Sequence, residues 1–357
     1  MHPRRLTSIL AAACRASFAA VALLIPLEAM AACAGRNLLD DLAAADPATH
    51  AAILAEGETV RNGGARLWRV VAPGEAGASD TTLISYLFGT YHDTGAHLTL
   101  SPAVEMAFEA ATRLVVELDP ASLEALAARV AGDPTFSLRA TPPSAGERLV
   151  DRLPRAGRQA AEAALAARGL TLPMADRLAP WLLFSTLGVP ACELSAMGAG
   201  AEVLDTRLMS AAVASGKPVT GLERYETALS AIDALPPDIA ADMIVDALLM
   251  ARHEEDVRAT LMDSYAKGQI GTLWAASQFL GQRFSGRPAA EAERMAEAFD
   301  EGIIVARNRA WMAPLLPIMA DGGAFVAVGA LHLPGEAGLV ALLRAEGYKV
   351  TPIDEGN

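Results

Sequence analysis

The stretch LFGTYH at residues 87–92 places Gly-x-x-His directly after an apolar run, and VAVGALH at residues 326–332 repeats this arrangement near the other end of the chain. Short apolar runs rich in β-branched and aromatic residues are typical of buried strands. Each motif is followed by a predicted helix and then by another apolar run. The sequence therefore contains the unit strand, Gly-x-x-His, helix, strand twice.

These two units predict the fold. In the first unit, Ser101 and Pro102 are residue types that begin a helix, and residues 113–118 (RLVVEL) form the next predicted strand. In the second unit, residues 335–345 are the predicted helix and residues 348–353 (YKVTPI) the last strand. Strands joined through helices pair in parallel. We therefore expect an α/β fold with a central mixed, mainly parallel sheet, built from two related β-GxxH-α-β halves and flanked by helices.

Further strands and a large helical region complete the expected fold. Residues 67–71 and 83–88 are predicted strands joined by a turn, and residues 217–222 form a short strand in the middle of the chain. The region from about 120 to 320 is otherwise predicted to be helical, an insert within one domain that spans residues 32–357. The predicted helices are 38–55, 121–131, 158–168, 179–187, 201–215, 223–234, 238–267 and 289–312, with loops at 132–146 and 281–288.

The first thirty residues differ from the rest. Arg4 and Arg5 precede the apolar run ASFAAVALLIPL at residues 16–27, and residues 29–31 have the Ala-x-Ala form of a cleavage site. This order predicts a signal peptide at residues 1–31 and a periplasmic or secreted mature protein. A retained membrane anchor is the alternative, but the run is shorter than the ~18 residues that span a bilayer. No later stretch reaches that length, so we expect no membrane span in the mature chain.

Cysteine usage agrees with export. Cys14 lies within the predicted signal peptide, which leaves Cys33 and Cys192 as a pair. In an oxidising compartment we expect these two to form a disulfide, which contributes about 4–5 kcal/mol in the chain-entropy model. Two alternatives stay open. The thiols are unpaired and buried, or Cys33 carries a lipid anchor, since residues 30–33 resemble a lipoprotein cleavage box.

The composition disfavours some classes of function. The net charge is −13, with 52% hydrophobic and 5% aromatic residues. Such a chain has ample material for a core, and its negative charge repels phosphate backbones, which argues against a nucleic-acid partner. The sequence has neither the G-x-S-x-G nucleophile elbow nor the phosphate-binding loop G-x-x-x-x-G-K-[ST]. The Ala-rich helices are compatible with a homodimer, although nothing in the sequence requires one.

The Gly-x-x-His motifs and one carboxylate define a candidate site. Gly89 and Gly329 are expected to let the chain turn sharply as it leaves each strand, and to keep side-chain atoms away from anything that binds there. His92 and His332 are then expected at the carboxyl ends of the strands, where imidazole suits a divalent metal or acid–base chemistry. Glu117 stands in an otherwise apolar strand, and a buried carboxylate needs a partner or a metal. The two histidines and Glu117 are a candidate metal-binding set with open positions.

Simpler explanations exist for each of these residues. The histidines also fit loop residues with local hydrogen bonds, and Glu117 fits an edge-strand residue that faces water. Arg307 and Asn308 lie on the helix before the second motif, where an Arg either stabilises an oxyanion or belongs to a solvated face. Asp205 and Glu223 flank the short central strand within reach of the site, although Glu223 also fits a helix cap.

Five segments form a pattern that extends over much of the chain: YLFGTYH (86–92), VVELD (115–119), GKPVTGLE (216–223), ARNRAW (306–311) and FVAVGALHLPGEAGLVALLRAEGYKV (325–350). Together they resemble the TraB/GumN family, which includes the Tiki-type proteases that cleave Wnt proteins. The resemblance covers nearly the whole mature chain and is most specific in the last segment. It implies a fold like that of the erythromycin-esterase/ChaN group, with a central sheet from two related halves.

The resemblance also implies a chemistry. Tiki-type members are described as metal-dependent peptidases that use both Gly-x-x-His histidines and a glutamate. Here those residues are His92, His332 and Glu117, with Arg307 and Asn308 as supporting catalytic residues and manganese or cobalt as the metal. The expected function is therefore a divalent-metal-dependent hydrolase acting on a peptide or small molecule. The alternatives are a non-enzymatic periplasmic binder of a peptide, haem or metal, and a structural envelope protein with a vestigial site.

One segment departs from the family pattern. Family members often open the central helix with Gly-x-Asp, whereas Asp205 follows Gly200 at a wider spacing. The resemblance therefore assigns no role to Asp205.

Overall fold

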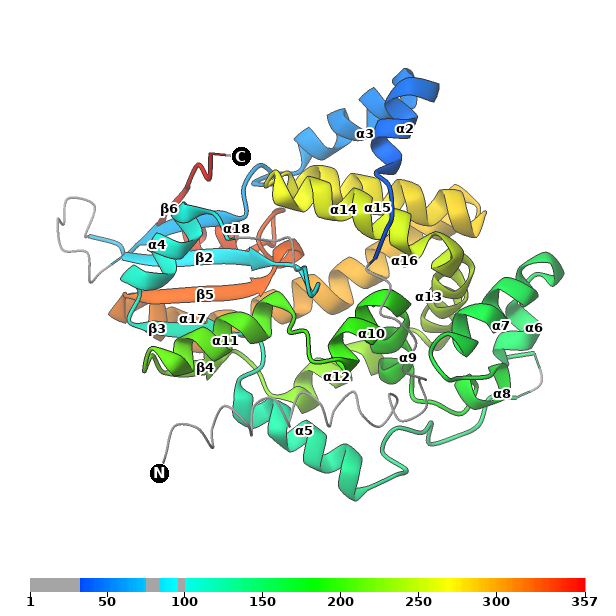
Figure 1. Ribbon diagram of the computed structural model, residues 1–357. Coiled ribbons are helices and arrows are strands. Elements are labelled where there is room, and N and C mark those ends of the chain that lie inside the picture. Colours follow the sequence, from blue (N-terminus) through cyan, green and yellow to red (C-terminus); the bar gives the residue numbers. More distant parts are fainter. Residues whose placement is uncertain (1–32, 75–83, 96–99, 145, 357) are drawn as a thin grey trace.

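The described part of the chain contains a six-stranded sheet, which lies to one side of the large helical region (Figure 1). The computed structural model describes residues 33–74, 84–95, 100–144 and 146–356. The predicted signal peptide at residues 1–31, and residue 83 of a predicted strand, lie outside these ranges. The strands are β1 (Leu67–Val71), β2 (Ile84–Thr90), β3 (Arg113–Val116), β4 (Val219–Gly221), β5 (Ala324–Gly329) and β6 (Lys349–Pro352), in the order β4-β3-β5-β2-β1-β6.

The sheet is mixed and mainly parallel, which confirms the predicted fold class. β5 pairs in parallel with β2 on one side and with β3 on the other, and β4 pairs in parallel with β3. β1 is antiparallel to both of its neighbours, β2 and β6. The two predicted units interlock, because β5 of the second unit lies between β2 and β3 of the first. Gly89 is therefore paired with Val328, and Thr90 with Gly329.

Helices cover the sheet and form a large region beside it (Figure 1). In chain order they are α2 (Leu38–Ala45), α3 (Pro47–Thr59), α4 (Pro102–Ala110), α5 (Pro120–Gly132), α6 (Leu149–Arg152), α7 (Arg158–Ala166), α8 (Leu172–Ala175), α9 (Pro180–Leu187), α10 (Ala191–Gly198), α11 (Leu204–Ala214), α12 (Tyr225–Asp233), α13 (Pro237–Met250), α14 (Glu254–Ala266), α15 (Ile270–Ser285), α16 (Ala289–Phe299), α17 (Ala306–Asp321) and α18 (Leu339–Ala345). As predicted, most of the chain between residues 120 and 320 is helical.

Two apolar layers enclose the sheet because successive side chains of a strand point to opposite faces. Phe88 and Phe325 pack with residues of α4 and α11 on one face. Their neighbours Leu87 and Val326 pack with residues of α17 and α18 on the other. The central strands are buried on both faces, which explains why they are continuous apolar runs.

Two predicted helix boundaries were wrong for local reasons. The helix expected at residues 38–55 is divided at Asp46, whose side chain accepts a hydrogen bond from the Thr49 N–H and so caps a new helix that begins at Pro47. The loop expected at residues 281–288 is shorter, because α15 continues to Ser285 and ends at a left-handed glycine, as helices often do.

Two longer predicted helices are also divided. A short 3₁₀ turn at Ala251–His253 separates α13 from α14. A π-helical turn at Asp300–Val305 separates α16 from α17, which then continues to Asp321 with two prolines inside it. These irregular turns keep the chain helical, so the apolar periodicity gave no sign of them.

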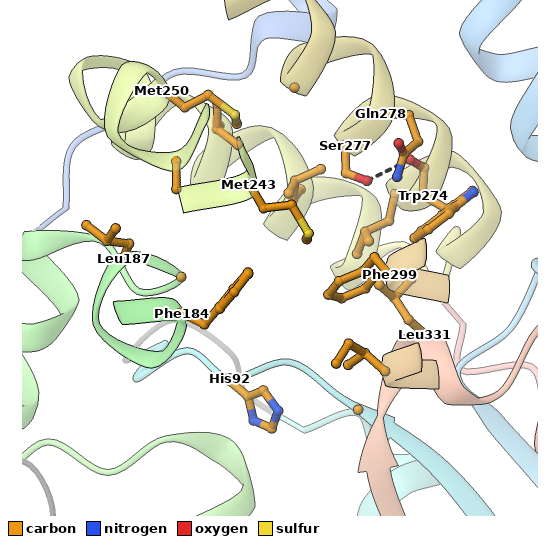
Figure 2. A pocket seen from close by; sticks show the side chains of 18 of the residues that line it. His92, Phe184, Leu187, Met243, Met250, Trp274, Ser277, Gln278, Phe299 and Leu331 are labelled. Atoms are coloured by element: carbon orange, nitrogen blue, oxygen red, sulfur yellow. Dashed lines mark hydrogen bonds between the residues drawn. The ribbon is translucent and has the colours of Figure 1, made fainter. Parts of the chain in front are cut away.

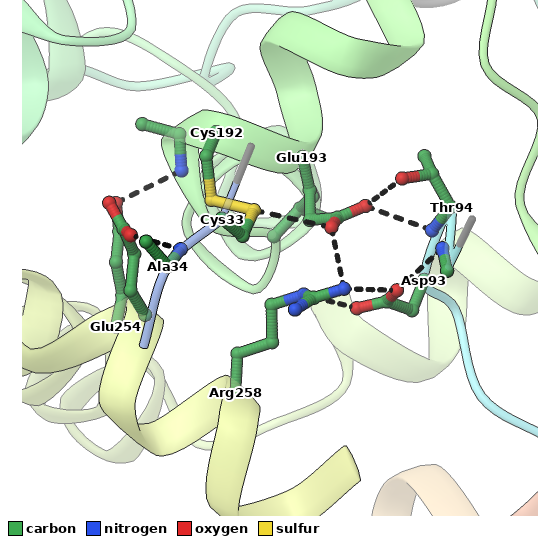
Figure 3. The surroundings of a disulfide bond; sticks show 12 residues. Cys33, Ala34, Asp93, Thr94, Cys192, Glu193, Glu254 and Arg258 are labelled. Atoms are coloured by element: carbon green, nitrogen blue, oxygen red, sulfur yellow. Dashed lines mark hydrogen bonds and ion pairs between the residues drawn. A yellow bond between two sulfur atoms is a disulfide. The ribbon is translucent and has the colours of Figure 1, made fainter. Parts of the chain in front are cut away.

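The predicted disulfide between Cys33 and Cys192 is present (Figure 3). It joins the start of the described chain to α10. The segment after Cys33 then follows α14, where the Ala34 N–H donates to Glu255 and the Leu38 N–H donates to Thr260. None of the described helices is long and apolar enough to cross a membrane.

Candidate functional site

Both Gly-x-x-His motifs lie at the carboxyl ends of neighbouring parallel strands. β2 ends at Thr90 and β5 at Gly329, so the two turns leave the sheet at the same edge. A β-carbon added to Gly329 would lie 3.3 Å from Glu117 Oε1, 3.5 Å from His332 Cδ2 and 3.9 Å from His92 Nε2. The structure therefore brings the three predicted metal-binding residues together around Gly329.

Close packing explains the two glycines. Gly329 has φ −51° and ψ 135°, a conformation that any residue can adopt, and the φ angle of Gly89 is not positive either. The chain turns into a 3₁₀ helix directly after Gly329, but a left-handed backbone conformation is not the reason for glycine at either position. A β-carbon on Gly89 would lie 2.8 Å from the Cα of Ala330, which leaves no room for a side chain.

We expect Gly89→Ala to lower the free energy of unfolding by about 1–3 kcal/mol, because the new β-carbon meets backbone that cannot move alone. Gly64→Ala is the matched control, since Gly64 is exposed and an added β-carbon has no neighbour within 4 Å. Its effect should stay within about 0.5 kcal/mol. Urea-induced unfolding of the two variants measures the difference, and equal losses would contradict the packing role.

Asp205 orients His92. His92 Nδ1 lies 2.9 Å from Asp205 Oδ2, and Asp205 Oδ1 accepts a 2.6 Å hydrogen bond from the Thr90 hydroxyl. Because a carboxylate accepts, Nδ1 carries a proton, and Nε2 is the ring nitrogen near Gly329. The negative charge of Asp205 raises the pKa of His92 to about 9. The His92 side chain is 62% exposed, and Figure 2 shows it pointing into a cavity.

Asn308 orients His332. The Asn308 amide nitrogen donates to the carbonyl oxygens of His332 and Ala337, at 3.1 and 3.0 Å. Its Oδ1 lies 2.7 Å from His332 Nδ1 and is the accepting group, so Nε2 keeps its lone pair. Burial lowers the pKa of His332 to about 4, which makes the ring neutral at physiological pH. The Trp311 ring packs 4.4 Å from the imidazole, centroid to centroid.

Glu117 directly follows β3 and is held by two donors. Its Oε1 accepts a 2.7 Å hydrogen bond from the Gly329 N–H, and its Oε2 lies 2.6 Å from Arg307 Nη2. Burial alone would raise the pKa of Glu117, but the neighbouring His332, Arg307 and His92 and the Gly329 N–H lower it to about 2. Glu117 is therefore ionised, 15% exposed and turned into the site rather than toward bulk water.

Arg307 joins Glu117 to a second carboxylate. Its Nε donates to Glu223 Oε1 at 3.0 Å, and its Nη1 lies 3.3 Å from His332 Nε2. Glu223 is thus a member of the site and not a helix cap. Among the described residues, its other oxygen, Oε2, is buried without a hydrogen-bond partner. Burial alone would lower the pKa of Arg307, but Glu117 and Glu223 raise it, so the guanidinium stays charged.

The π-helical turn at Asp300–Val305 precedes α17 directly. Such turns contain one residue more than an α-helical turn, and they are frequent at functional sites. Three side chains beyond this turn contact the cluster formed by His92, Glu117 and His332 around Gly329. Arg307 contacts Glu117, and Asn308 and Trp311 contact His332.

Sequence reasoning missed three residues of this site. Thr90 lies inside the first motif, and Trp311 lies four residues after Arg307, on the same face of the helix. The position of Thr90 within the motif and the four-residue spacing of Trp311 from Arg307 could have indicated that both residues belong to the site. Tyr265, whose hydroxyl donates to the Gly89 carbonyl at 2.8 Å, stands in an unremarkable part of α14 and had no such signal.

A cavity of about 680 Å³ extends from this cluster into the helical region (Figure 2). His92, Glu117, Arg307, Gly329 and His332 line one part of it, and residues of α9, α13, α14, α15 and α16 line most of the rest. The cluster is therefore accessible to a bound molecule.

A model of the TraB/PrgY/gumN family matches residues 68–352. The chain belongs to the TraB/PrgY/gumN family. The match extends from β1 to the end of β6, so this TraB/PrgY/gumN protein has every residue of the cluster within the matched region. The resemblance inferred from the sequence is confirmed. No curated protein and no solved structure was found to match the chain.

Proposed function

We propose that this TraB/PrgY/gumN protein is an exported, divalent-metal-dependent hydrolase whose metal is held by His92, His332 and Glu117. One observation carries the proposal. Two imidazoles and an ionised carboxylate converge around Gly329, and a polar side chain fixes the Nδ1 atom of each imidazole. Histidine ligands of metals are held in this way in proteins, with the second ring nitrogen facing the metal. Metal binding to His92 would release the proton that its raised pKa places on Nε2.

The donor types fit a divalent ion such as manganese or cobalt. The unpartnered Glu223 Oε2 adds negative charge beside the cluster, which favours a cation. Within the described ranges, however, no three His, Cys, Asp or Glu side chains stand as a ready-made metal site. Arg307 explains this, because its guanidinium pairs with Glu117 and faces His332 Nε2. In the protein without metal, Arg307 supplies the positive charge that the carboxylates need.

When bound, such an ion supplies Lewis acidity that activates a carbonyl group and a water. The chain's own groups support hydrolysis at the same place. Arg307 remains protonated and lies beside Glu117, where its N–H groups can donate to the oxyanion that forms on a substrate carbonyl. Asp205 and Asn308 act as positioning residues, because they set which nitrogen of each histidine faces the site.

Metal content tests the proposal. After manganese loading and dialysis, elemental mass spectrometry should find about one metal ion per wild-type chain and none in His92→Ala/His332→Ala. The control is His50→Ala/His253→Ala, which removes two histidines outside the cluster and should keep the metal. Retained metal in the first variant, or none in any folded protein, would refute the metal site. A peptide-library cleavage screen of the loaded enzyme then tests hydrolysis.

The cavity favours a second candidate function. A large, mostly apolar cavity is typical of binding proteins as well as enzymes. A non-enzymatic periplasmic binder would retain its ligand stoichiometrically and release no product. Product analysis after incubation with the ligand separates the two functions.

A further inference from the structure

The cavity is amphipathic, with a polar part at the strand ends and an apolar wall farther away. The side chains of Phe184, Leu187, Met243, Met250, Trp274 and Phe299 line it, from α9, α13, α15 and α16 (Figure 2). Methionine and leucine side chains adapt to a ligand that has no fixed shape. The wall therefore suits a flexible apolar group.

The backbone of the wall offers little to a polar ligand. Most wall residues lie within helices, where the N–H and C=O groups are already bonded along the helix, and only residues at helix ends, such as Leu187 on α9, are exceptions. The strands that reach the cavity, β2 and β5, are paired on both sides within the sheet, so neither offers a free edge. A bound peptide would need partners for its own N–H and C=O groups. An alkyl chain needs none.

The charged side chains of the wall are also occupied. Asp246 pairs with Arg287, and Glu254 pairs with Arg168 at 2.6 Å and accepts a 3.0 Å hydrogen bond from the Ala191 N–H. Both carboxylates are therefore paired with groups of the protein, and neither needs a ligand as a partner. The Ser277 and Ser285 hydroxyls donate to carbonyl groups of their own helix, so Gln278 and Gln282 remain as the α15 side chains that can bond a ligand. Two amide groups are too few partners for a peptide backbone.

We infer that the cavity accommodates the alkyl chain of an acyl ester, with the ester carbonyl placed at Glu117, His332 and Arg307. The chemistry rests on the proposed function, whereas the fit of the chain rests on the cavity alone. Hydrolysis breaks the bond between the acyl carbon and the ester oxygen and adds one water across it. The products are a fatty-acid carboxylate, an alcohol and a proton. The acid is therefore a product that also occupies the cavity.

Calorimetric titration of the full mature chain without metal, using octanoate, decanoate, dodecanoate and tetradecanoate below their micelle concentrations, tests the inference. Each added pair of methylene groups should lower Kd about 15-fold until the chain fills the apolar part, because each buried methylene is worth ~0.8 kcal/mol. Beyond that length Kd should level off. An affinity that does not change with chain length overturns the inference.

A matched pair of variants locates the binding. Met243→Gln keeps the length of a wall side chain but places an unpaired amide against the alkyl chain, and it should raise the Kd of dodecanoate about tenfold. Met106→Gln makes the same change at a side chain that is 63% exposed on α4, and it should leave the Kd unchanged. Equal effects of the two changes overturn the assignment to this cavity.

A peptide competitor and the metal measurement separate the remaining outcomes. If an apolar octapeptide amide binds more tightly than dodecanoate, the cavity is a peptide site and the inference fails. If chain-length dependence is present but manganese is not retained, the hydrolase proposal fails and acyl-chain binding stands. If manganese is retained and chain length has no effect, only the acyl-chain inference fails.

Discussion

Arg307→Met should lower the free energy of unfolding of the metal-free protein by about 3–5 kcal/mol, as measured by urea denaturation at neutral pH. The variant leaves Glu117 and Glu223 without their cationic partner, and their side chains are only 15% and 4% exposed. Methionine replaces much of the side-chain volume, so the loss reports the buried charges rather than a new void. Two unpaired buried carboxylates are the physical origin of the effect.

Arg309→Met is the matched control, two residues away on the same helix. Arg309 pairs with Glu301 at the surface, where the two side chains are 61% and 65% exposed, so its loss should stay below about 1 kcal/mol. The double variant Arg307→Met/Glu223→Gln should recover part of the stability, because one orphaned charge is removed. If Arg307→Met were as stable as Arg309→Met, Glu117 and Glu223 would have to be solvated by water in the variant, and the predicted cost of buried unpaired charges would be wrong.

Cys33→Ser/Cys192→Ser should lower the free energy of unfolding by about 2–5 kcal/mol. The disulfide closes a loop between residues that are 159 positions apart, so it strongly restricts the unfolded chain. It also holds the first described residues against α14 (Figure 3). Urea denaturation of the wild type, with and without reductant, provides the comparison.

Reductant should destabilise the wild type by a similar amount and leave the serine variant unchanged. A second effect is expected near the site. Glu193 follows Cys192, and its carboxylate lies 3.3 Å from the Cys33 sulfur. The same carboxylate accepts a 2.9 Å hydrogen bond from the Thr94 N–H and pairs with Arg258. Hydrogen exchange of the loop after His92 should therefore increase in the serine variant. Unchanged stability would mean that the contacts of Ala34 and Leu38 with α14 suffice to hold the segment after Cys33.

The sheet was predictable because its strands carry their own signal. Runs such as residues 324–328 are buried on both faces of the sheet, so every side chain in them is apolar, and this continuous apolar run is visible in the sequence. The strand order was not predictable, since the interlocking of β5 between β2 and β3 depends on contacts between distant parts of the chain. Helix divisions at Asp46 and at residues 300–305 were missed because local capping and π turns leave the apolar periodicity almost unchanged.

The site was predictable only in part, because only some of its residues carry a local signal in the sequence. His92, His332 and Glu117 stand out because polar residues at the ends of apolar strands are unusual. The partners that orient them come from elsewhere, with Asp205 on α11 and Asn308 on α17, and sequence spacing alone does not reveal which partner serves which histidine. The apolar wall was invisible, because Met243 and Phe184 resemble ordinary core residues until the cavity beside them is known.

The π-helical turn at Asp300–Val305 decides how this stretch tolerates a change in length. The turn holds one residue more than a regular α-helical turn, so it can lose one residue and continue as α-helix, with Arg307 and Asn308 still at the strand ends. In a regular α-helix, which turns by about 100° per residue, the same deletion would rotate every later residue by that angle. A single-codon deletion in this turn should therefore disturb the support of Glu117 and His332 less than one within α16.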